Sequence, residues 1–135
     1  MIFNMNGGSG GMTLLWQGED VEDSTVNTAF PEQTIPCDVS RYRAFLLVMR
    51  SQKELTSGWN YFTCMVGNLA EESMTACGCT ASLGFHRRNL KITAEGIWFS
   101  GNGYKDILVS SSSGDLQIVS ENGEFAVPYQ IYGLR

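Results

Sequence analysis

The sequence predicts an all-β fold, a mostly antiparallel β-sandwich of the jelly-roll kind. Short apolar or alternating segments are separated by turn signals roughly every 8–15 residues, which is typical of sandwiches and barrels. No segment shows the apolar spacing of an amphipathic helix of ordinary length. The chain also has 15 glycines and only 17% charged residues, against about 25% in average domains. This composition suits a β-protein with tight turns.

Chain length and glycine distribution predict one folded domain with a short extension. The chain has 135 residues, the size of a single domain. Residues 1–11 contain the run Gly-Gly-Ser-Gly-Gly, which behaves as a flexible coil. We therefore expect a flexible glycine-rich leader at 1–11 and a single β-sandwich domain at 12–135. The leader is either a solvated tail or an arm that joins neighbours in an assembly.

The first half of the domain has distinct local patterns. Apolar residues 12–16 predict a strand, and the two prolines within 30–36 predict an irregular edge strand because proline lacks a ladder donor. Asp38 should cap a short helical turn over 38–42. The apolar run 44–50 predicts either a central strand covered on both faces or a strand at a subunit contact.

The second half is punctuated by glycine, serine and asparagine. We expect strands at 59–66, 73–81, 83–94, 97–100, 116–119 and 125–132, loops at 101–103 and 110–114, and a turn at 121–123. The basic residues His86, Arg87, Arg88 and Lys91 would split between the two faces of one strand. We expect them at a solvated edge of the sheet.

Cys37, Cys64, Cys77 and Cys79 predict no metal site. The Cys-x-Cys spacing differs from the usual zinc spacing, and two further ligands are missing. Free thiols are the default in a reducing compartment. A hairpin centred near residues 70–71 would place Cys64 opposite Cys77, so a disulfide from Cys64 to Cys77 or Cys79 stays an alternative.

Charge and hydropathy exclude several partners. The net charge is −5 with no basic stripe, so we expect no nucleic acid. No apolar run approaches the ~20 residues of a membrane span, and no signal-peptide pattern is present, so we expect a protein made in the cytoplasm and no membrane partner. The acidic loop 18–24 lacks the spacing of a calcium site, and we expect it to be a solvated turn.

Few residues could support catalysis, so we expect no enzyme and no cofactor. His86 is the single histidine, and no nucleophile elbow or phosphate-binding loop accompanies it. A glycosidase pair among the 14 acidic residues stays open. Aromatic rings beside polar groups favour sugar binding instead, because an apolar pyranose face stacks on a ring. The candidate ligand-binding residues, led by the first and last, are Trp59, Tyr61, Trp98 and Tyr104.

Several segments, in their order along the chain, carry a resemblance to a known group. They are Met-Ile-Phe-Asn-Met with the glycine-rich run at 1–11, Leu-Trp at 15–16, Phe-Pro-Glu-Gln-Thr-Ile at 30–35, Asp-Val-Ser-Arg-Tyr at 38–42 with the apolar strand that follows, residues 87–92, Gly-Ile-Trp-Phe-Ser at 96–100, and Val-Pro-Tyr-Gln-Ile-Tyr-Gly-Leu-Arg at 127–135. Together they resemble the small tail-associated modules of bacteriophages and prophages of Gram-positive bacteria. Segment 51–82 carries none of it.

The resemblance implies a virion tail or baseplate accessory protein that is assembled in the bacterial cytoplasm. It also implies a homo-oligomer, such as a trimer, with other tail proteins and host cell-wall polysaccharide as partners. Runs 44–50 and 125–132 could provide the contact between subunits, or could be ordinary core. Two alternative functions stay open: a purely structural head or neck decoration module, and a cell-wall glycan hydrolase.

Overall fold

The computed structural model describes residues 11–18, 30–52, 61–79 and 84–135. Some of the sequence predictions fall outside these residues. They concern the glycine-rich leader, most of the acidic loop, Trp59, and the outermost residues of the strands predicted at 59–66, 73–81 and 83–94.

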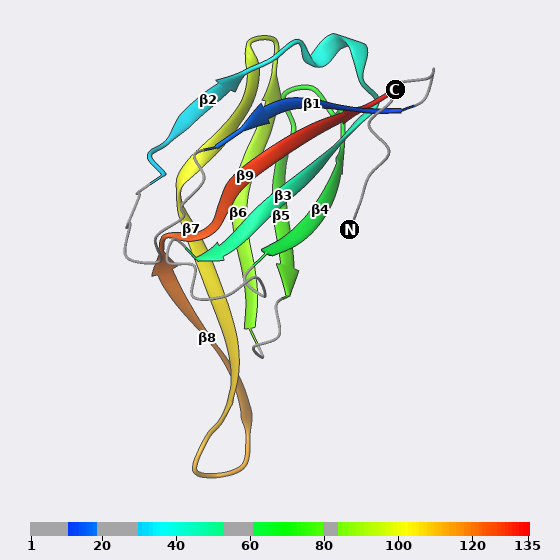
Figure 1. The fold of residues 1–135 in the computed structure, drawn as a ribbon. Coiled ribbons are helices and arrows are strands. Elements are labelled where there is room, and N and C mark those ends of the chain that lie inside the picture. Colours follow the sequence, from blue (N-terminus) through cyan, green and yellow to red (C-terminus); the bar gives the residue numbers. More distant parts are fainter. Residues whose placement is uncertain (1–10, 19–29, 53–60, 80–83) are drawn as a thin grey trace.

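Two antiparallel sheets form the protein (Figure 1). Sheet A has the order β1 (Met12–Gln17), β9 (Phe125–Leu134), β3 (Ala44–Gln52), β4 (Tyr61–Gly67). Sheet B has the order β2 (Gln33–Pro36), β7 (Gly96–Ser110), β6 (Gly84–Thr93), β5 (Ser73–Cys79), and β8 (Leu116–Gly123) also pairs with β7. A short 3-10 helix, η1 (Val39–Arg41), precedes β3.

Alternate residues of the strands point into the space between the sheets. Phe45, Leu47 and Met49 of β3 are fully buried, as are Ile97 and Phe99 of β7. These side chains belong to one apolar cluster drawn from both sheets. Burial of this kind supplies most of the folding free energy. The all-β sandwich prediction is confirmed, while the jelly-roll pattern and the leader stay predictions.

The elements expected in the first half of the domain form as predicted. The run 44–50 lies in β3, which pairs with β9 on one side and β4 on the other. The Asp38 carboxylate accepts a hydrogen bond from the Ser40 backbone N–H at 3.1 Å and so caps η1. β2 pairs with β7 alone among the described strands, as expected for an edge strand that contains a proline.

Two segments predicted as a loop and a turn are strand instead. Residues 101–103 lie within β7, and residues 121–123 lie within β8, where Gly103 pairs with Gly123. The glycines there accompany close packing and a register shift between β6 and β7 rather than a chain reversal. β7 and β8 therefore form one long hairpin that reverses at 111–114 and whose far end extends beyond the sandwich (Figure 1).

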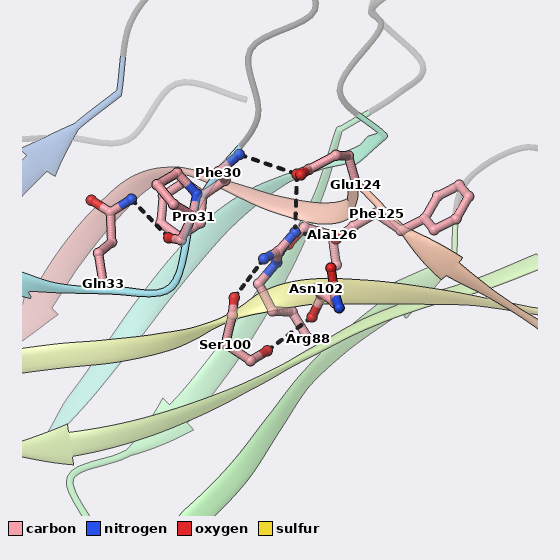
Figure 2. A network of polar contacts seen from close by, with 9 residues as sticks. All are labelled: Phe30, Pro31, Gln33, Arg88, Ser100, Asn102, Glu124, Phe125 and Ala126. Carbon is pink, nitrogen blue, oxygen red and sulfur yellow. Dashed lines mark hydrogen bonds and ion pairs between the residues drawn. The ribbon is translucent and has the colours of Figure 1, made fainter.

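Arg88 on β6 is fully buried, so the solvated edge predicted for the basic cluster is wrong. β6 is an interior strand between β7 and β5. The Arg88 guanidinium donates to the carbonyl oxygens of Ala126 (2.8 Å), Ser100 (2.6 Å) and Phe125 (3.0 Å), as Figure 2 shows. Glu124 Oε2 lies 3.7 Å from Arg88 Nη2. These partners compensate the cost of burying the charge.

Between β8 and β9 the chain crosses from sheet B to sheet A. The crossing passes so close to Gly103 that a Cβ there would lie 1.7 Å from the Phe125 carbonyl oxygen. Ala126 then takes φ 49°, a left-handed conformation that side chains rarely adopt. Glycine at 103 leaves room for the crossing, and the hydrogen bonds from Arg88 hold the backbone in this conformation.

β4 and β5 lie in different sheets, so the hairpin predicted around residues 70–71 does not form. The strands face each other across the layers instead, where Gly78 packs on the Phe62 ring. The Cys64 thiol lies near the Cys77 backbone. The two residues are thus close, but across the sandwich and not along a ladder, and all four cysteines are free thiols.

Candidate functional site

The face of sheet B opposite the core carries two of the predicted ligand-binding aromatics, Trp98 and Tyr104. Trp98 lies between Ile97 and Phe99, which both point into the core, so its indole is directed outward. Across the ladder, its neighbours are Thr34 on β2 and Lys91 on β6. We call this surface the Trp98 face, which consists of Glu32, Thr34, Asn89, Lys91, Trp98, Ser100, Asn102 and Tyr104.

Trp98 separates two open hollows on this face. The first hollow, of about 470 Å³, has a lining of Thr34, Lys91, Thr93, Glu95 and Trp98. The second, of about 400 Å³, has a lining of Glu32, Asn89, Trp98, Ser100, Gly101, Asn102 and Tyr104. Each hollow therefore combines an aromatic wall with hydroxyl, amide or charged groups, and the second has an aromatic residue at either end.

The Trp98 indole is held in place by a hydrogen bond. Its Nε1–H donates to Glu32 Oε1 at 3.1 Å. Glu32 precedes β2, so the contact joins the edge of sheet B to the ring. This hydrogen bond restricts the indole to one orientation and leaves its flat apolar surface available for stacking.

Tyr104 is held by a charged cluster on the same side of the sheet. The Arg87 guanidinium lies 4.3 Å from the centre of the Tyr104 ring. Arg87 Nε in turn donates to Asp106 Oδ2 at 2.7 Å, and Ser120 Oγ donates to Asp106 Oδ1. The hydrogen bonds from Arg87 and Ser120 hold the pKa of Asp106 below its usual value. The cluster therefore keeps its charges at neutral pH and orients the phenol.

Tyr61 is not part of the Trp98 face. It lies on β4 of sheet A, with its ring centre 5.3 Å from that of Tyr129, and Arg50 lies over the Tyr129 ring at 5.6 Å. Tyr61 pairs with Arg50 on the side of the sheet opposite the core residues Phe62 and Met49. The structure thus brings together two of the four predicted aromatics and places the third on the other sheet.

The acidic residues near Trp98 are divided between the two hollows. Among the described residues, Glu95 is the one carboxylate in the lining of the first hollow, and Glu32 is the one in the lining of the second. The paired carboxylates of a glycosidase need a common cleft, and the described lining of neither hollow has that arrangement. No group of three His, Cys, Asp or Glu residues that could hold a metal occurs within the described ranges.

His86 is 2% exposed and lies between two aromatic rings, away from the Trp98 face. Its ring centre is 6.4 Å from that of Phe62 and 6.0 Å from that of Phe125. Among the described residues, neither ring nitrogen has a hydrogen-bond partner of good geometry, although the Ser51 backbone is close. Burial, with a smaller effect from the charge of Lys105, lowers the pKa of His86, and the Ser51 backbone opposes this shift. The histidine is therefore a neutral core residue.

Sequence reasoning missed the polar half of the site, above all Glu32, Asn89 and Asn102. Asn89 and Lys91 alternate with the buried residues Leu90 and Ile92, and this alternation could have placed them on the outer face. Glu32 carries no such signal, because the pairing of β2 with β7 joins segments more than 60 residues apart.

In comparisons with known proteins, no family model, no curated protein and no solved structure matches this chain. Among the residues that the structure describes, no helix has the length and hydropathy to cross a bilayer.

Proposed function

We propose that the chain is a tail or baseplate accessory module of a bacteriophage or prophage that binds host cell-wall carbohydrate through the Trp98 face. The observation that carries the binding proposal is the Trp98 indole, fixed by Glu32 between two hollows that both contain polar groups. No catalytic step is part of the proposal.

The chemistry of the Trp98 face matches that of sugar-binding surfaces. A pyranose ring has an apolar face that stacks on an indole or a phenol, and its rim of hydroxyls needs donors and acceptors close by. The second hollow supplies Trp98 and Tyr104 for stacking, and Glu32, Asn89 and Asn102 for hydrogen bonds. The hollows also have the volume of ordinary ligand sites, roughly 300–1,000 Å³.

The virion context of the proposal rests on the sequence. Segments in the order of the chain resemble tail-associated modules, and two of them contribute to the Trp98–Glu32 contact, since Glu32 lies in 30–35 and Trp98 lies in 96–100. A sandwich with a continuous apolar core also suits a virion component that is assembled in the bacterial cytoplasm and must stay folded without cofactors. Other tail proteins are the partners that this context proposes.

Binding to purified cell-wall polysaccharides and to a glycan array tests the proposal. We expect the unaltered chain to bind one class of wall glycan, and Trp98→Ala to weaken that binding about tenfold or more, equivalent to about 1.4 kcal/mol. Phe85→Ala is the matched control. Phe85 is 57% exposed on the same side of sheet B, but it lines neither hollow, so its loss should leave binding unchanged.

The outcomes separate the rival functions. Absence of binding by the unaltered chain would overturn the carbohydrate proposal and favour a purely structural decoration module. Equal weakening by Trp98→Ala and Phe85→Ala would overturn the assignment of the binding site to the Trp98 face. Release of soluble sugar during the incubation would favour a hydrolase.

A further inference from the structure

The free end of the β7–β8 hairpin exposes an unusual concentration of apolar side chains. Five of the nine exposed large apolar side chains in the described part of the chain belong to this segment, which we call the arm (residues 105–121). They are Leu108 (56% exposed), Val109 (37%), Leu116 (68%), Ile118 (72%) and Val119 (45%). Figure 1 shows the arm projecting below the two sheets.

Apolar groups occupy both faces of the arm. Leu108 pairs with Ile118 on one face, and Ile107 pairs with Val119 on the other. A two-stranded ribbon without a third strand or a covered face is marginally stable in water, and contiguous apolar surface of this extent marks an interaction site. The arm therefore needs a partner that extends it sideways.

The outer edge of β8 lacks the features that protect edge strands from pairing. β8 has eight residues, contains no proline or lysine, and pairs with β7 without a register shift. Two other edge strands have such features: β1 has a register irregularity between Leu14 and Trp16, and β2 has four residues and ends in Pro36. The edge strands β4 and β5 pair as regularly as β8, but Met65 is the one exposed large apolar side chain described on them. Irregularities, prolines and short length are the usual means of blocking an edge. β8 pairs only with β7 among the described strands, so its other edge is open.

We propose that the arm pairs with the arm of a second copy of this chain, β8 against β8, antiparallel about a two-fold axis. Two identical edges satisfy each other in this arrangement, which is the simplest closed symmetry. It yields a four-stranded ribbon, β7–β8–β8–β7, in which each arm gains two further strands beside its β8 edge.

The side chains of β8 make this edge suited to a second copy. Leu116, Ile118 and Val119 of one copy would lie beside the same residues of the other on the two faces of the ribbon. Such cross-strand apolar pairs contribute roughly 0.2–1 kcal/mol each, and the backbone hydrogen bonds along the two β8 edges add to this.

The pairing has a consequence for carbohydrate binding that rests on the proposed function. A two-fold axis perpendicular to a sheet leaves the two copies with the same face on the same side. Both Trp98 faces then point in one direction, so a polysaccharide surface can engage them together. The gain in avidity can reach 10²–10⁴ over a single site.

Sedimentation velocity of the full chain tests the pairing directly. We expect the unaltered chain at the mass of a dimer and Ile118→Lys at half that mass, because two lysines would face each other near the axis. Met65→Lys is the matched control, since Met65 is 62% exposed on β4 of sheet A, and it should stay dimeric. Unchanged far-ultraviolet circular dichroism shows that each variant is folded.

A cross-linking measurement distinguishes the symmetric contact from other contacts. In a background carrying Cys77→Ser and Cys79→Ser, an added Ile118→Cys should give a covalent dimer with a short bismaleimide, and the background alone should not. A monomeric unaltered chain, a dimer that survives Ile118→Lys, or a dimer without this cross-link overturns the proposal. If the chain is monomeric and still binds carbohydrate through the Trp98 face, the pairing is overturned and the proposed function is retained.

Discussion

Arg88 Nε donates a 2.8 Å hydrogen bond to the carbonyl oxygen of Ala126, so a side chain of sheet B holds the backbone of sheet A where the chain changes layers. Burial lowers the pKa of Arg88 to about 10, and the nearby Glu124 carboxylate opposes this shift. The guanidinium therefore stays charged at neutral pH and acts as an internal clamp between the sheets.

Replacing Arg88 should destabilise the protein strongly. Arg88→Met leaves Glu124 and the carbonyl oxygens of Ser100, Phe125 and Ala126 without this partner. We expect the free energy of unfolding in urea to fall by about 3–5 kcal/mol. The neighbouring Arg87→Met should cost at most about 1 kcal/mol, because Arg87 pairs with Asp106 near the surface. Equal losses for the two variants would contradict the clamp.

Gly103 should tolerate no side chain. A Cβ at this position would lie 1.7 Å from the Phe125 carbonyl oxygen, which belongs to the backbone and cannot rotate away. We expect Gly103→Ala to lower the melting temperature sharply, with a cost of about 2–4 kcal/mol from displacing the crossing. Gly114→Asn is a suitable comparison, since the space around Gly114 is open and asparagine accepts its positive φ. Thermal unfolding of both variants decides the point.

His86 should make stability depend on pH. Burial holds its folded pKa below the ordinary 6.5, so the unfolded chain binds a proton first as pH falls. The unfolding free energy should therefore decrease between about pH 7 and about pH 5. His86→Leu should remove most of this slope in urea titrations at the two pH values. A slope that is equal in both proteins would show that His86 does not cause it.

The four thiols should react at different rates. Burial raises the pKa values of Cys37 and Cys64, whereas Cys77 and Cys79 are exposed. Because the thiolate is the reactive form, iodoacetamide should alkylate Cys77 and Cys79 first. Peptide mass spectrometry over time measures the order, and all four should react alike in denaturant. Faster modification of Cys64 than of Cys77 in the native protein would be evidence against this structure.

Glu32 should contribute to carbohydrate binding through Trp98. Glu32→Ala removes the acceptor of the indole N–H, and we expect glycan affinity to fall about threefold to tenfold, as for loss of one hydrogen bond. Tyr61→Ala, on the other sheet, should leave the affinity unchanged. The reverse order of effects would move the binding site from sheet B to sheet A.

The sequence by itself determined the class of fold and much of its inner surface. The continuous apolar run 44–50 predicted β3. Period-2 alternation marks which residues share a face, and it is enough to place Trp98 on the face opposite Ile97 and Phe99. Proline and glycine signals marked the edge strand β2 and the reversal at 111–114. Trp98 and Tyr104 were recognised as candidates because an aromatic ring beside polar groups can stack on the apolar face of a sugar.

Only the tertiary structure decided which strands became neighbours. Arg88 was expected in solvent because a charge is buried only when partners come with it, and its partners in 124–126 lie more than 30 residues away. Glu32 reached Trp98, and residues 101–103 stayed in a strand, for the same reason: pairing between distant segments overrode the local signal. Alternation predicts the face of the sheet to which a side chain points, but the pairing of distant strands decides which residues that side chain contacts.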